Sequence, residues 1–270
     1  MKKKKIITRL IVLIMALTFI SPTVYAAYSA ITGNSDITKT VIIPQEVQDI
    51  ISQSDPENFD KNINNYKNLL IELDVHQFFK DRIEELLKAG HKLSDILISY
   101  EFLNDSFGEL KDLETLMFEK ESGKDWKTIF KAYNDRNPEF VPSSFEPEHL
   151  EKLMSIPEIT ADDIMIADRV AQKLGKPISD IINHRVDGMS WKNINAGYGV
   201  LNAQAGIPHV SVTPEQIDKY TEDGMEREKV ILAFVIAMKM EKDPNEIIEK
   251  IRSGETKEQI YATYYLQKYE

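Results

Sequence analysis

The fold is decided by the stretch Asp187-Gly188-Met189-Ser190-Trp191-Lys192-Asn193-Ile194-Asn195-Ala196-Gly197-Tyr198, because its pattern recurs on both sides. The other two copies begin at Ser122 and Ser253, so the glycines of the three copies are spaced 65 and 66 residues apart. Positions that keep this register are the glycines Gly123, Gly188 and Gly254, the isoleucines Ile129, Ile194 and Ile260, and the tyrosines Tyr133, Tyr198 and Tyr264. Such register over three copies indicates an internal repeat.

Each copy has the residues of one helix end followed by one helix start. The glycine suits the left-handed conformation that ends a helix. Asp125, Ser190 and Thr256 then stand where the next helix needs an N-cap oxygen. Isoleucine and tyrosine four residues apart lie on one face of that new helix.

Further helices are predicted before each glycine turn. A short helix lies directly before the turn, a longer one precedes it at 93–107, 160–174 and 225–241, and Pro44, Pro147 and Pro214 mark the start of another. The sequence therefore predicts an all-α fold, a helical repeat array of three units of about four helices with a period of about 66 residues. The units are 44–143, 144–211 and 212–270, and the first is enlarged by an extra helical hairpin near 62–90.

Residues 1–26 have the pattern of a secretory signal peptide. A basic start that includes Lys2 and Arg9 is followed by the apolar run 10–20 and by small residues ending at Ala26. We expect cleavage after Ala26, a loose leader at 27–43, and a bacterial protein that is secreted or held in the cell envelope. The apolar run is short for a membrane span, so no span is expected after cleavage; an uncleaved N-terminal anchor is the alternative.

The predicted mature chain is strongly acidic and has no cysteine. Removing five of the 33 basic residues leaves 28 against 44 acidic ones, a net charge of about −16. This charge argues against nucleic acid as a partner and favours basic partners or cations. The absence of cysteine in an exported chain means that the core alone must stabilise the fold.

The aromatic residues of the repeat are the candidate binding residues. Trp126 and Trp191 follow the N-cap directly, and Lys257 stands in their place in the third copy. The candidate set is Trp126, Tyr133, Trp191, Tyr198 and Tyr264, which could line a groove for a protein, a peptide or a cell-wall glycan. The alternative is that each indole closes its own turn against the preceding helix, since aromatic side chains at helical spacing usually supply core area.

No motif points to catalysis, a metal or a cofactor. The five histidines do not stand at metal-ligand spacing, and the acidic cluster of Asp162, Asp163 and Asp168 fits the first turns of a helix better than a calcium loop. Residues 181–200 resemble the first two helices of a helix-turn-helix, but the following residues 200–214 contain no Lys or Arg to read DNA.

These observations predict a function in binding or in structure. We expect an exported bacterial helical-repeat protein, not an enzyme, that acts as a binding or structural module at or outside the cell envelope. The alternative is a cell-wall or carbohydrate-active hydrolase whose catalytic carboxylates the sequence does not single out. Capture of extracellular DNA or RNA would require a basic stripe hidden in the acidic total.

Overall fold

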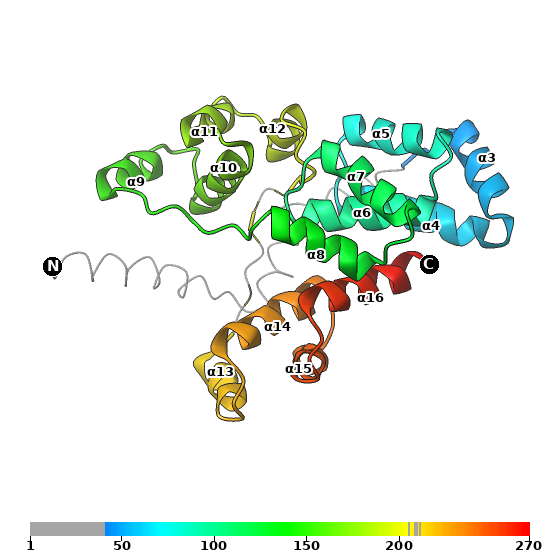
Figure 1. Ribbon diagram of the computed structural model, residues 1–270. Coiled ribbons are helices and arrows are strands. Elements are labelled where there is room, and N and C mark those ends of the chain that lie inside the picture. Colours follow the sequence, from blue (N-terminus) through cyan, green and yellow to red (C-terminus); the bar gives the residue numbers. More distant parts are fainter. Residues whose placement is uncertain (1–40, 205, 208–209, 211) are drawn as a thin grey trace. The chain divides into compact units, whose positions relative to one another are not determined.

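The structure is a computed structural model that describes residues 41–204, 206–207, 210 and 212–270, so the predicted signal peptide and most of the leader lie outside the described residues. The described chain is built from α-helices and one 3₁₀ turn, Pro56–Asn58, without a strand (Figure 1). The predicted all-α fold is confirmed. Among these residues, the helices lack the length and apolar character that crossing a membrane requires.

The helices fall into the three predicted segments. Residues 44–143 hold α3 Gln45–Ser54, α4 Phe59–Glu72, α5 Gln77–Lys88, α6 Leu93–Asp105, α7 Leu110–Glu121 and α8 Trp126–Arg136. Residues 144–211 hold α9 Pro147–Met154, α10 Ala161–Leu174, α11 Ile178–Val186 and α12 Trp191–Gly197. Residues 212–270 hold α13 Pro214–Thr221, α14 Arg227–Lys239, α15 Pro244–Arg252 and α16 Lys257–Tyr269. The extra helices of the first segment, α4 and α5, lie where the hairpin is predicted, and each packs against α3.

The glycine turns have the geometry that the sequence predicts. Gly123, Gly188 and Gly254 have φ of 94°, 84° and 94°, which is the left-handed region. Each glycine N–H and the N–H after it bond back to the helix that ends there, as in Gly188 N to Arg185 O at 3.0 Å. Asp125 and Ser190 cap the following helices by accepting from Thr128 N and Asn193 N.

A second recurrent turn joins the longer helix of each segment to the shorter one. Phe107, Gly175 and Glu241 occupy it with φ of 51°, 62° and 51°. Only one of these three residues is glycine, and a left-handed phenylalanine is uncommon. A glycine therefore marks this turn in one predicted copy of three, although the left-handed residue recurs at intervals of 68 and 66 residues.

The described chain forms two compact units. The larger contains 41–207 and 258–270, and the smaller contains the described residues of 208–257. In the smaller unit α13 packs on α14 and α14 on α15, and the Tyr220 hydroxyl donates to Asn245 Oδ1 at 2.5 Å. The larger unit has two hydrophobic clusters, one centred on α3–α8 and one on α10–α12.

Helix α16 belongs to the larger unit, although the sequence assigns it to the third repeat. Its Tyr265 and Tyr269 are buried in the cluster of α3–α8. Tyr265 donates to Asp105 Oδ2 at 2.8 Å, and Tyr269 donates to the buried Glu101. Lys268 bonds to Glu101 at 3.0 Å. The end of the chain is therefore part of the core around α6.

Candidate functional site

The two indoles of the predicted binding set are buried. Trp126 and Trp191 are each 1% exposed, so their rings do not offer a stacking surface to a large ligand. The Trp126 ring lies 5.5 Å from the Phe130 ring inside the first cluster, and Trp191 belongs to the second cluster. This burial is what the core interpretation of the indoles expects.

The tyrosines of the set divide between the same two clusters. Tyr133 is buried in the first cluster, 5.3 Å from the Phe102 ring, and the partly buried Tyr264 packs against that cluster. Tyr198 packs against the second cluster, where its hydroxyl lies 3.1 Å from His184 Nε2. The structure thus groups Trp126 with Tyr133 and Tyr264, and Trp191 with Tyr198, in cores and not along one exposed face.

Asp163 connects three elements around Trp191. Its Oδ1 accepts from Trp191 Nε1 at 2.7 Å and from Arg185 Nε at 2.8 Å, and its Oδ2 accepts from Thr160 N at 2.9 Å in a capping box. Burial alone would raise the pKa of Asp163, but the hydrogen bonds from Thr160, Arg185 and Trp191 outweigh it and lower the pKa. The carboxylate thus stays charged and ties the start of α10 to the turn between α11 and α12.

The first copy has the same three positions with different contacts. Asp95 is the third residue of α6, as Asp163 is of α10, Trp126 begins α8 as Trp191 begins α12, and Lys120 stands three residues before the glycine, as Arg185 does. Within the described chain, the buried atoms Asp95 Oδ1 and Trp126 Nε1 find no hydrogen-bond partner. Burial raises the pKa of Asp95.

The third copy has lost all three residue types together. Lys229, Ile251 and Lys257 occupy the positions of the carboxylate, the cation and the indole. The aspartate and the tryptophan are therefore present together in the first two predicted copies and absent together from the third.

The other acids of the predicted acidic cluster, Asp162 and Asp168, also accept hydrogen bonds that stabilise the fold. Asp168 accepts from Ser143 N and Ser143 Oγ, both at 2.7 Å, and Asp162 accepts from Ile207 N at 3.1 Å. Each of these acids therefore fastens a connecting segment to α10. A search of the described residues for acids and histidines that could share a metal ion finds no such group.

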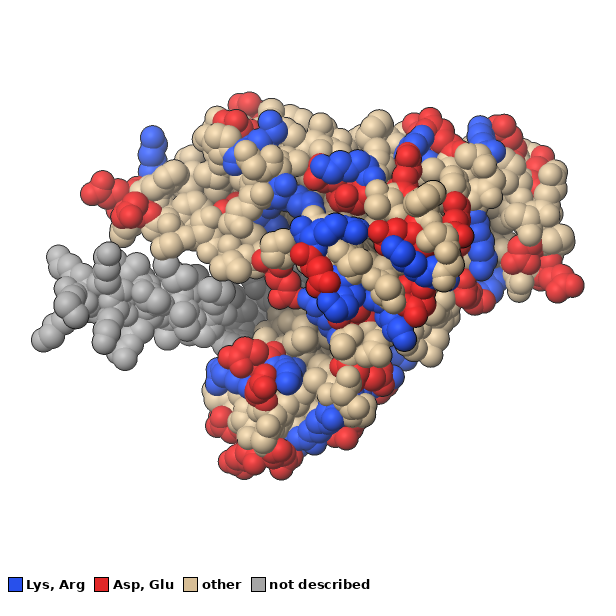
Figure 2. All heavy atoms as spheres, viewed as in Figure 1, with Lys and Arg blue, Asp and Glu red and all other residues tan. Residues whose placement is uncertain are grey.

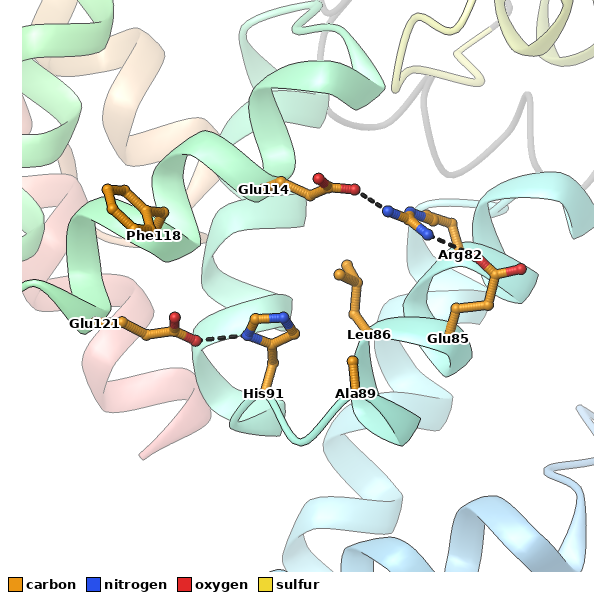
Figure 3. A pocket seen from close by; sticks show the side chains of 8 residues that line it. All are labelled: Arg82, Glu85, Leu86, Ala89, His91, Glu114, Phe118 and Glu121. Atoms are coloured by element: carbon orange, nitrogen blue, oxygen red, sulfur yellow. Dashed lines mark hydrogen bonds and ion pairs between the residues drawn. The ribbon is translucent and has the colours of Figure 1, made fainter.

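A pocket of about 300 Å³ lies between α5 and α7, beside the loop that leads into α6 (Figure 3). Its lining combines apolar and charged side chains. The lining residues are Arg82, Glu85, Leu86, Ala89, His91, Glu114, Phe118 and Glu121.

Polar bridges cross the pocket at two places. Arg82 pairs with Glu85 at 2.7 Å and with Glu114, while His91 Nδ1 lies 2.5 Å from Glu121 Oε1 (Figure 3). Phe118 lies on α7 between Glu114 and Glu121 and is 73% exposed. The pocket therefore offers an aromatic ring among carboxylates that are partly open to solvent.

The sequence contains a signal for Phe118 that lies outside the repeat pattern. Leu113, Leu116 and Met117 form the buried face of α7. Phe118 follows them directly and is turned about 100° away on a helix of 3.6 residues per turn, so an aromatic side chain stands on the polar face. The sequence does not show which residues of α5 line the pocket with Phe118, since only the tertiary structure brings them opposite α7.

Charged side chains of both signs are mixed on the face drawn in Figure 2. A comparison with models of known protein families gives no match for this chain, and comparisons with curated proteins and with solved structures give none either.

Proposed function

We propose that this chain is an exported bacterial binding module that acts at or outside the cell envelope and contacts a protein partner through the pocket between α5 and α7. The observation that carries the proposal is the exposure of Phe118 over this pocket. An exposed aromatic ring that lines a pocket beside Leu86 and Ala89 is a candidate contact surface, because covering apolar area is favourable and aromatic anchors carry much of the energy at interfaces.

The surroundings of Phe118 support contact with a macromolecule. The ring is flanked on α7 by Glu114 and Glu121, whose side chains are 57% and 48% exposed. Protein interfaces typically combine apolar surface with polar side chains that remain accessible to solvent. Residues at positions 114, 118 and 121 are spaced so that they share one helix face, which a peptide can follow.

The hydrolase alternative finds less support. A catalytic acid needs a raised pKa at an open site. Among the described carboxyls, burial raises the pKa of Asp95 and Glu101, and neither lines the pocket. Glu101 is buried and bonded to Lys268 and Tyr269 of α16, which is a structural environment.

Export is tested with the full chain expressed in a Gram-positive host. We expect the protein in the medium or the wall fraction, with a mass and N-terminus that begin at Ala27. An intact N-terminus in the membrane fraction would support the uncleaved anchor. Full-length protein in the cytosol would refute export.

Binding is tested by selecting peptides from a random library on the purified full chain. Peptides that use the pocket should bind the Phe118→Ala variant about tenfold more weakly, since truncation of an interface aromatic commonly costs that much. Phe78→Ala is the matched control, because Phe78 is 51% exposed on α5 and does not line the pocket. Selected peptides that bind all three proteins equally would refute the pocket as the binding site.

The rival site at the repeat aromatics has its own test. Acrylamide quenching of tryptophan fluorescence should be weak for both indoles, since each is 1% exposed. Strong quenching that a peptide or glycan suppresses would restore the groove lined by Trp126 and Trp191.

A further inference from the structure

We infer that the pocket between α5 and α7 recognises a basic segment of the partner protein, in which a Lys or Arg packs its stem against Phe118 and pairs its charge with the carboxylates. This inference rests on the proposed function and specifies the chemistry of the ligand. It follows from the net negative charge of the pocket, from the solvent exposure of its ion pairs, and from the aromatic ring of Phe118.

The charges at the pocket are predominantly negative. Its lining contains Glu85, Glu114 and Glu121 against one arginine, Arg82, which gives a formal charge of −2 with His91 neutral. The whole chain carries −11. A segment with Lys or Arg is attracted both by the pocket and by the molecule, whereas an acidic segment or an anionic membrane surface is repelled.

The existing ion pairs can be exchanged for pairs with a ligand. The side chains of Arg82 and Glu85 are 34% and 62% exposed, and Glu114 is 57% exposed. Pairs between solvent-exposed groups contribute little to stability. A ligand cation can therefore form an ion pair with Glu114 or Glu121 while Arg82 remains paired with Glu85. No buried charge is then left without a partner.

Phe118 itself favours a cationic side chain. The face of an aromatic ring attracts an ammonium or guanidinium group, and the long stems of Lys and Arg bury apolar surface against the ring. Leu86 and Ala89 supply more apolar surface at the same pocket. One ligand side chain can thus satisfy both the ring and a carboxylate, which gives the site its preference for Lys and Arg over a purely apolar residue.

The test determines the amino-acid composition of the selected peptides whose binding depends on Phe118. We expect these peptides to be enriched in Lys and Arg. Calorimetry with a synthetic copy of the most enriched peptide should show affinity falling at least tenfold between 50 and 300 mM salt, because exposed charges are screened. The double variant Glu114→Gln/Glu121→Gln should bind it at least fivefold more weakly than the parent protein.

The matched control is Glu148→Gln/Glu151→Gln, which removes two exposed carboxylates from α9 and should change the affinity less than twofold. Peptides that depend on Phe118 but are neutral or acidic would overturn the inference and leave the proposed function standing. Equal weakening by both double variants would also overturn it, because net charge alone would then explain the effect. If no peptide depends on Phe118, the proposed function fails and the inference fails with it.

Discussion

Asp163 and Asp95 occupy matching positions in two of the predicted repeat units, yet their surroundings differ. Asp163 accepts hydrogen bonds from Trp191 and Arg185, whereas Asp95 has a buried oxygen without a partner among the described residues. The cation differs as well, because Lys120 stands in the position of Arg185 and lies 5.4 Å from the Trp126 ring. Arginine presents several donors in a planar fork, whereas lysine presents one compact charge. The three positions thus form a hydrogen-bonded anchor in the second predicted copy, and in the first a contact between the Lys120 ammonium and the Trp126 ring.

Neutralising the two aspartates should show the largest difference. Asp163→Asn removes the charge that holds Arg185 and is expected to cost about 3 kcal/mol of unfolding free energy. Asp95→Asn should cost less than about 0.5 kcal/mol or stabilise the fold, because burial already disfavours its charged form. Urea unfolding followed by tryptophan fluorescence measures both. Equal losses would show that the two copies use the carboxylate alike.

Shortening the indoles should give the next largest difference. Trp126→Phe and Trp191→Phe remove the same volume from buried sites, but only the second removes a hydrogen bond to a carboxylate. We expect Trp191→Phe to cost about 1.5–3 kcal/mol more, as for a hydrogen bond to a charged group. Each variant leaves one tryptophan as the fluorescent reporter of the other copy. A larger loss for Trp126→Phe would contradict the comparison.

The two carboxyls should respond to pH in opposite directions. The pKa of Asp163 is lowered on folding, so its stabilisation is present at neutral pH and is lost as pH falls through the folded pKa. The pKa of Asp95 is raised by burial, so its ionisation costs stability as pH rises from the unfolded to the folded pKa. Unfolding free energy between pH 7 and 3 should therefore fall less steeply in Asp163→Asn and more steeply in Asp95→Asn than in the parent chain. Parallel curves for the three proteins would refute this assignment.

Converting the first copy toward the second should have the smallest effect. Lys120→Arg gives Asp95 a donor fork and is expected to stabilise the fold by about 0.5 kcal/mol, because the site is only partly buried. The same substitution in an Asp95→Asn background should have no effect. A double-mutant cycle measures the coupling, and a coupling energy of zero would show that the two side chains do not interact.

Much of the fold could be predicted from the sequence because its signals are local. Gly123, Gly188 and Gly254 adopt left-handed turns, and Pro147 and Pro214 begin helices, as the chain predicts. Caps and turns depend on hydrogen bonds between residues a few positions apart, so a short window contains all the partners. Helices were predicted to end at Phe107 and Glu241, but the left-handed conformation of these residues was not predicted, because neither is the usual residue for it.

By itself, the sequence determined the helices, their order and the register of the recurrent glycine turns. Only the tertiary structure decided which buried groups meet: Trp191 with Asp163, 28 residues away, and Tyr269 with Glu101, 168 residues away. It also placed α5 opposite α7 and so formed the pocket at Phe118. The physical reason is that burial selects partners by packing across the whole chain, and one helix's pattern shows which face is apolar but not what covers it.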